Sequence, residues 1–144
     1  MTQTPSVIPM LSYEDGITAM DWLCRAFGFT AGERFIDEGR LSHGELISEG
    51  GGMIMLATPT PDYEGPRHHR QHCAQAAQWS KVPWVINGIL VYVMDIDAHR
   101  AQAAAHGAHM LGEMEDGFPG RRYRCEDIEG QRWMFMQAGD GATS

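Results

Sequence analysis

The sequence predicts an α+β fold made of two βαβββ units that follow one another along the chain. Two stretches have the apolar spacing of an amphipathic helix, and each lies between one strand-like segment and three more. Turns that contain glycine separate several of these segments. The same order of elements recurs with a period of about 80 residues, which indicates an internal repeat.

The first half of the chain begins with a short strand at residues 7–13, VIPMLSY. Residues 14–29 follow as a helix, because apolar side chains from Ile17 to Phe27 recur at helical spacing and Gly28 supplies a natural end. The glycines between the last two of the remaining strands indicate a hairpin. These three strands are expected at residues 31–36, 40–48 and 52–58.

The pattern breaks over residues 59–82, which begin with prolines and have no clean period. We expect a connecting loop here, with a short helix over residues 71–79. The second half starts with an apolar strand at 85–94 and a helix at 95–108, whose ends Asp95 or Asp97 and Gly107 mark. Its three remaining strands are expected at residues 109–114, 121–127 and 132–137.

These elements predict one domain over residues 1–144. Within it we expect a first unit at residues 7–58, a connecting loop at 59–82 and a second unit at 83–137.

Composition excludes several functional classes. The net charge of −8 disfavours binding to nucleic acid and to anionic membranes, and no apolar run is long enough to span a bilayer. The three cysteines, Cys24, Cys73 and Cys125, are far apart and odd in number. This indicates reduced thiols and therefore a cytoplasmic protein.

Three stretches of the chain resemble the vicinal oxygen chelate superfamily, which includes glyoxalase I, bleomycin resistance proteins and extradiol dioxygenases. They are YEDGITAMDWLCRAFGF, VYVMDIDAHRAQAAAHGA and GRRYRCEDIEGQRWMF. The last resembles the D-P-E-G turn of this family, with Ile128 in place of the usual proline. The resemblance covers about residues 7–137 and implies a curled mixed sheet around one cavity and a homodimer.

In metal-dependent members, four oxygen or imidazole donors point into this cavity. The equivalent positions of this chain fall near Ile8, Met55, Gly88 and Met134. None of these residues offers a donor that magnesium, nickel or zinc prefers. We therefore expect no metal and no cofactor in the cavity.

Strand alternation divides the remaining apolar residues into two sets. One set packs against the helices, and the other set faces the cavity, where flexible methionine side chains suit an apolar or aromatic ligand. Ordinary core filling is the alternative explanation for the methionines. The expected ligand-binding residues are Met10, His43, Glu45, Met53, Met55, Tyr92, Arg132, Met134 and Met136.

Two further groups of residues have a possible chemical role. His43 and Glu45 share one strand face and form either an acid–base pair or a polar exposed face. His68, His69, His72 and Cys73 form a dense group of metal donors, for which a mobile loop is the plainer interpretation. Trp79 and Trp84 either stack on an aromatic ligand or anchor the loop or a dimer contact. One of Arg121, Arg122 and Arg124 pairs with an anionic ligand, or all three balance nearby surface charge.

The sequence therefore predicts a protein that binds a small apolar or aromatic molecule in a metal-free cavity lined by methionine. The first alternative is a metal-independent isomerase or lyase that uses His43 and Glu45. The second is a metal-dependent enzyme similar to glyoxalases or dioxygenases, with the ion held by residues 68–73 and His43.

Overall fold

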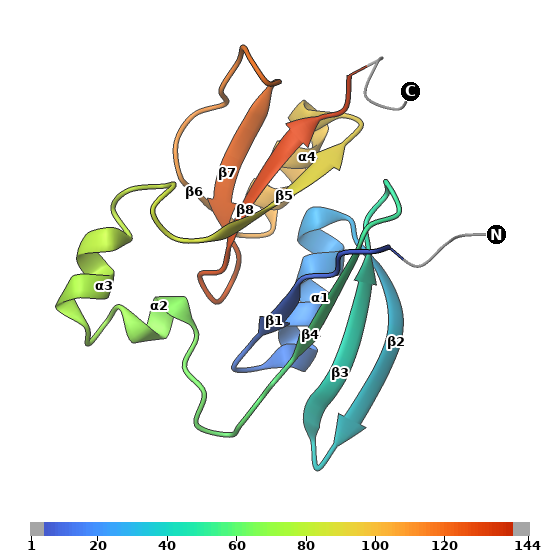
Figure 1. The fold of residues 1–144 in the computed structure, drawn as a ribbon, viewed down its shortest axis with the longest axis vertical. Helices are drawn as coiled ribbons and strands as arrows, with labels where there is room; N and C mark the ends of the chain where they lie inside the picture. The colour runs from blue at the N-terminus through green and yellow to red at the C-terminus, as the bar shows by residue number, and fades with distance from the viewer. Residues whose placement is uncertain (1–4, 140–144) are drawn as a thin grey trace. The chain divides into compact units, whose positions relative to one another are not determined.

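The computed structural model describes residues 5–139 (Figure 1). The chain divides into two compact units, of which the first ends at Gly65 and the second begins at Pro66. Each unit contains one four-stranded mixed sheet, and the sequence of strands and helices confirms the predicted pair of βαβββ units.

The first unit contains β1 (Met10–Ser12), α1 (Gly16–Phe27), β2 (Thr30–Asp37), β3 (Arg40–Ile47) and β4 (Met53–Ala57). The strand order is β1-β4-β3-β2. β1 is parallel to β4, whereas the other neighbours are antiparallel.

Helix α1 covers one face of the first sheet (Figure 1). Its N-terminus is capped by the Asp15 carboxylate, which accepts a hydrogen bond from the Thr18 N–H at 3.1 Å. Gly28 ends the helix with a φ of 77°, a left-handed conformation that glycine adopts without steric cost. The buried side of the helix includes Trp22 and Leu23, which pack into the core of this unit.

The second unit contains α2 (Pro66–His69), α3 (Ala74–Trp79), β5 (Gly88–Val93), α4 (Ile96–Ala105), β6 (His109–Met110), β7 (Arg122–Glu126) and β8 (Arg132–Gln137). The strand order β5-β8-β7-β6, with β5 parallel to β8, repeats that of the first unit.

The core of the second unit is aromatic. Tyr123, Trp133 and Phe135 are almost completely buried, and their rings stack in sequence across β7 and β8. His99 of α4 lies over Phe135 at a centroid distance of 4.2 Å and shares a 2.7 Å hydrogen bond with the Tyr123 hydroxyl. Helix α4 itself buries only Ile96 and Ala103. Its many alanines therefore let the helix lie close to the sheet but contribute little side-chain volume to the core.

Residues 59–82 contain more structure than the sequence predicted. The short helix expected at 71–79 is present as α3, but α2 was not expected, because its proline and paired histidines have no apolar period. Strand β6 is much shorter than the predicted 109–114, because regular pairing is interrupted after Leu111 and returns only as a single bridge between Glu115 and Arg122. No helix within residues 5–139 is long and apolar enough to cross a bilayer.

Candidate functional site

Strand alternation gives the second sheet two unlike faces. Phe135 and Tyr123 point toward α4, as the ring contacts with His99 show. The opposite face, which we call the open face of the second sheet, carries Leu90 and Arg124 on either side of Met134, because the strands place both residues in register with it. The alternation expected from the sequence is therefore present in this sheet.

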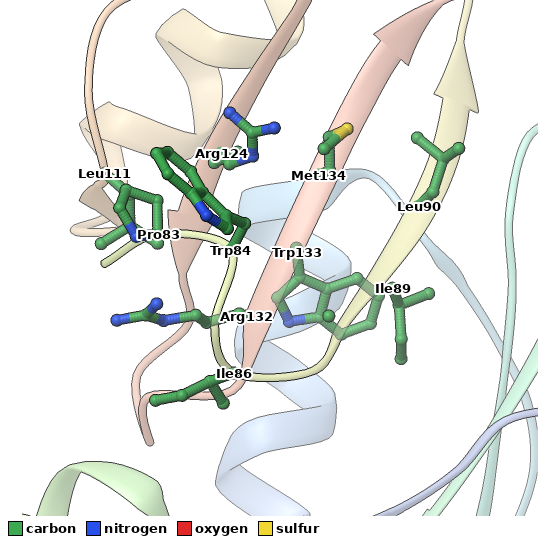
Figure 2. A pocket seen from close by; sticks show the side chains of 11 residues that line it. Pro83, Trp84, Ile86, Ile89, Leu90, Leu111, Arg124, Arg132, Trp133 and Met134 are labelled. Atoms are coloured by element: carbon green, nitrogen blue, oxygen red, sulfur yellow. The ribbon is translucent and has the colours of Figure 1, made fainter. Parts of the chain in front are cut away.

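A pocket with a volume of about 180 Å³ lies on this open face (Figure 2). Its floor comes from β5, β7 and β8, and its wall comes from the chain that enters β5. The lining residues are Pro83, Trp84, Ile86, Gly88, Ile89, Leu90, Leu111, Arg124, Arg132, Trp133 and Met134. The lining contains two cationic groups and no carboxylate, and the remaining side chains are apolar.

Trp84 and Arg124 form one side of the pocket. The Trp84 side chain is 71% exposed, and the Arg124 guanidinium lies 5.9 Å from its ring centroid. Such a cation–π contact orients the indole although one of its faces remains open to solvent. Glu115 pairs with Arg124 and, at 3.2 Å, with Arg122. Arg124 is therefore held in place by two neighbours, and the indole presents an aromatic surface at the mouth of the pocket.

Arg132 lies beneath this surface and is 3% exposed. Its guanidinium donates to the Glu126 carboxylate at 3.1 Å and to the carbonyl oxygens of Val82 and Ser80. Arg70 donates two further hydrogen bonds to Glu126, both at 2.8 Å. Residues 66–87, which lead into β5, are called the connecting segment below. These hydrogen bonds fasten the connecting segment to β7 and β8 and thereby fix the wall that carries Trp84.

Glu126 carries a negative charge in this network. Burial alone raises the pKa of a carboxyl group, but the hydrogen bonds and charges of Arg70 and Arg132 outweigh it and hold the pKa of Glu126 below its ordinary value of 4.5. One carboxylate between two guanidinium groups leaves the network with an excess of one positive charge. The network therefore adds to the positive charge of Arg124 near the pocket.

The turn between β7 and β8 is closed by Asp127. Its carboxylate accepts hydrogen bonds from the backbone N–H groups of Glu129 and Gln131 and from the Trp133 indole, all at 3.0–3.1 Å. Gly130 has a φ of 91°, and a Cβ atom at this position would lie 2.7 Å from the Arg67 backbone nitrogen. Glycine is thus required both by the backbone angle and by the close approach of α2.

The first sheet also has an open face, opposite α1. β1 and β4 place Met10 beside Met55, and β3 places Glu45 beside Met55 and Ile47 beside Met53. His43 lies on the same face as Glu45, and its Nε2 is 2.9 Å from the Glu45 carboxylate. This face therefore combines thioether side chains with one histidine–carboxylate pair.

The predicted ligand-binding residues have different surroundings in the two units. Met10, His43, Glu45, Met53 and Met55 share the open face of the first sheet. The open face of the second sheet carries the other four: Tyr92, Arg132, Met134 and Met136.

Of the four in the second unit, Met134 and Arg132 line the pocket, and Tyr92 is half exposed outside its lining. Met136 is only 2% exposed and lies against Gly120, so it contributes to the core. Arg132 is committed to Glu126 and to the connecting segment.

The prediction of binding residues omitted Trp84, Arg124 and Leu90, which line the pocket. Leu90 has the same strand parity as Met134, so its place was available from alternation alone. For Trp84 the sequence left ligand stacking and loop anchoring as alternatives, because the bonds that fix its segment involve the backbone carbonyls of Ser80 and Val82.

The positions equivalent to the family's metal donors do not fit a metal ion. In the first unit these positions are Ile8, which precedes β1, and Met55 in β4. In the second unit they are Gly88 in β5 and Met134 in β8, and none of the four residues has a side-chain oxygen or nitrogen donor. Thioether sulfur is a poor ligand for manganese, nickel and zinc, and aliphatic side chains offer no donor at all. No step of a reaction is therefore assigned to a metal at these strands.

A family model described as the Glyoxalase/Bleomycin resistance protein/Dioxygenase superfamily matches residues 9–135. The chain belongs to this superfamily. No curated protein matches the sequence. Several solved structures match the chain along most of its length.

The chain is similar to TioX from Micromonospora sp. ML1, with 28% identity, a TM-score of 0.65 and coverage of 94% of this chain and 97% of that one. It also resembles TnmS3, an antibiotic binding protein from Streptomyces sp. CB03234, with 16% identity, a TM-score of 0.64 and coverage of 95% and 98%.

A third similar structure is that of the fosfomycin resistance protein FosX from Listeria monocytogenes, complexed with Mn(II) and 1S,2S-dihydroxypropylphosphonic acid. It has 12% identity, a TM-score of 0.60 and coverage of 99% of this chain and 95% of that one. At these identities the TnmS3 and FosX matches show a common fold alone.

Proposed function

We propose that this superfamily member binds a small apolar or aromatic molecule without a metal ion, and that an aromatic group of the ligand enters the pocket beside Trp84 and Met134. The observation that carries the proposal is the pocket itself, in which an exposed indole, a thioether and Leu90 face one hollow. Aromatic rings stack favourably on indole, and methionine adapts to ligands of varied shape.

The size of the pocket limits what enters it. A closed cavity of about 150 Å³ accommodates benzene, whereas complete sites for drug-sized molecules occupy about 300–1,000 Å³. A pocket of about 180 Å³ therefore accepts one ring or a group of similar size. The rest of a larger ligand extends beyond the lining residues.

The donor chemistry supports binding without a metal. Thioether and aliphatic side chains occupy the strand positions where metal-dependent relatives place oxygen or imidazole donors. TnmS3 has the same fold and is an antibiotic binding protein. A binder of this kind protects a cell by lowering the concentration of free ligand, which requires affinity and abundance but no chemical step.

The test is a thermal-shift screen with bleomycin and with a panel of one- to three-ring aromatic compounds, followed by calorimetric titration of every compound that raises the Tm. A ligand that binds the folded state alone raises the Tm. The decisive variant is Trp84→Ala, and the matched control is Trp79→Ala, because Trp79 is also exposed but lies outside the pocket lining.

We expect at least one compound to bind, and we expect Trp84→Ala to lower its affinity about tenfold, equivalent to about 1.4 kcal/mol, while Trp79→Ala leaves it unchanged. A panel with no binder, or equal losses in the two variants, would contradict the assignment of the pocket.

Two further properties are part of this proposal. The sequence resemblance implies a homodimer, and we include this in the proposal. Light scattering coupled to gel filtration measures the oligomeric state directly. Cys24, Cys73 and Cys125 are free thiols, and this supports a reducing, cytoplasmic location.

A second candidate function is a metal-independent isomerase or lyase. The observation that favours it is the 2.9 Å contact between the His43 Nε2 and the Glu45 carboxylate. A carboxylate that orients an imidazole is a common arrangement for general acid–base catalysis. The partly exposed side chains of both residues leave the imidazole accessible to a substrate.

This second function is tested by incubating each compound that binds with the wild-type protein and with His43→Ala, and by following the products with NMR. Catalysis by this pair predicts turnover by the wild type, loss of turnover in the variant and nearly equal affinity in both. Recovery of every compound unchanged from the wild type would exclude it for those compounds.

A further inference from the structure

The connecting segment contains a group of imidazoles outside the ligand pocket. His68 and His69 end α2, and His72 lies in the turn that precedes α3. The centroid of the His72 ring is 5.8 Å from that of His68 and 5.9 Å from that of His69. All three side chains are exposed, and none of them lines the pocket.

The backbone keeps His68 and His72 on one face of the chain. Beyond α2, the N–H of Arg70 donates to the Pro66 carbonyl, and the N–H groups of Gln71 and His72 donate to the carbonyls of His68 and His69. The last two bonds join residues three positions apart, so this turn is tighter than an α-helix. The turn nevertheless brings the imidazoles of His68 and His72 together, as their centroid distance of 5.8 Å shows.

We propose that His68 and His72 bind a divalent transition metal ion, with one imidazole nitrogen from each residue and water at the remaining positions. A donor nitrogen of His68 and one of His72 lie within 4.8 Å of each other. Bonds of 2.0–2.1 Å to a tetrahedral zinc ion require a separation of roughly 3.3 Å. Rotation of two exposed side chains supplies the remaining approach of roughly 1.5 Å.

The donor type determines which ions fit. Imidazole nitrogen suits zinc, nickel and copper, whereas calcium and magnesium prefer oxygen. The site is separate from the strand positions that hold the metal in related enzymes. It is therefore compatible with a ligand pocket that contains no metal.

The ion would fasten a corner of the chain that lies between two anchored points. Before the corner, Arg67 donates to the carbonyls of Asp127 and Ile128. Within it, between the two histidines, Arg70 pairs with Glu126. After it, Ser80 and Val82 accept hydrogen bonds from Arg132. A metal held by His68 and His72 would restrict the turn between α2 and α3 and so stabilise the segment that leads to the wall of the pocket.

The test uses full-length protein without a histidine tag, stripped of metal with a chelator and titrated with Zn²⁺ in a calorimeter, in the absence of any organic ligand. The variants are His68→Ala, His72→Ala and, as the matched control, His109→Ala, which removes an exposed histidine elsewhere in the same unit. Circular dichroism confirms that each variant is folded. Because no pocket ligand is used, failure of the proposed binding function leaves this result unaffected.

We expect one equivalent of Zn²⁺ to bind, with a loss of affinity of about tenfold or more in His68→Ala and in His72→Ala and no change in His109→Ala. The wild type should also show a higher Tm with Zn²⁺ than without it. Absence of saturable binding, or an equal loss of affinity in His109→Ala, would overturn the proposal, since the ion would then be bound by histidines in general.

Discussion

The open faces of the two sheets carry different chemistry on the same strand order. In the first unit this face presents methionines and one histidine–carboxylate pair. In the second unit it presents a pocket whose floor includes a buried arginine between a carboxylate and two backbone carbonyls. The repeat therefore determines where the strands lie, and the residues on one face determine what each unit does.

The origin of the difference is the connecting segment. Residues 66–87 belong to the second unit and supply both the wall of its pocket and the carbonyl groups that Arg132 binds. The first unit is preceded by no comparable segment among the described residues 5–9. A buried charge is thus tolerated in the second sheet because an additional stretch of chain satisfies its hydrogen bonds.

The largest effect on stability is expected from Glu126→Ala. This substitution leaves Arg70 and Arg132 without their shared carboxylate, and Arg132 is buried. Removing one partner of a buried ion pair costs about 3–5 kcal/mol. Urea denaturation measures the free energy of unfolding, with Glu113→Ala, an exposed glutamate of the same unit, as the control.

A loss below about 1 kcal/mol would mean that solvent reaches the network and that the segment is held by other contacts. The hydrogen bonds of Glu126 and Arg132 would then not account for the difference between the two units.

Acid should weaken the second unit through the same residue. The pKa of Glu126 is lower in the folded state than its ordinary value of 4.5, so between these two values the unfolded chain alone takes up a proton. The free energy of unfolding should therefore fall as the pH drops below 4.5, and this contribution is fully present above that value.

Denaturation curves from about pH 7 to about pH 3 should show a shallower decline for Glu126→Gln than for the wild type, because the amide does not titrate. Parallel declines would show that other carboxylates account for the acid sensitivity.

A smaller effect is expected in the first unit from Thr58→Val. The buried Thr58 hydroxyl accepts a hydrogen bond of 2.8 Å from the N–H of Gly16, the first residue of α1. Valine keeps the shape but leaves this N–H unsatisfied, which costs about 1–3 kcal/mol. The same substitution at the exposed Thr30 of β2, measured by the same urea denaturation, should cost less than about 0.5 kcal/mol. An equal loss in both variants would mean that the bond to Gly16 is not specifically important.

The sequence predicted the fold well because periodicity encodes it. In the second sheet, alternation places Met134 on one face and Phe135 on the other. Gly28 ends α1, where the chain takes a left-handed conformation. Helix α2 was missed because its sequence has no periodic apolar pattern, and the strand at β6 was predicted too long.

The candidate site was predicted less well, for a physical reason. Arg132 was expected to reach a ligand, but its partners include two backbone carbonyls, and a carbonyl leaves no signal in the sequence. The same bonds position the wall that carries Trp84, so the role of this residue could be stated only as one of several alternatives. Contacts between side chains and distant backbone are the part of a site that sequence patterns do not contain.

The use of carbonyl oxygens by Arg132 has a consequence for how this protein tolerates change. Every amino acid has a carbonyl, so substitution at positions 80 and 82 alters the side chain but preserves the acceptor. Deletion or insertion within this stretch would instead move both oxygens away from the guanidinium and would leave a buried charge partly unsolvated. We therefore expect related chains to vary in residue type here while they keep the spacing, so that length is conserved where identity is not.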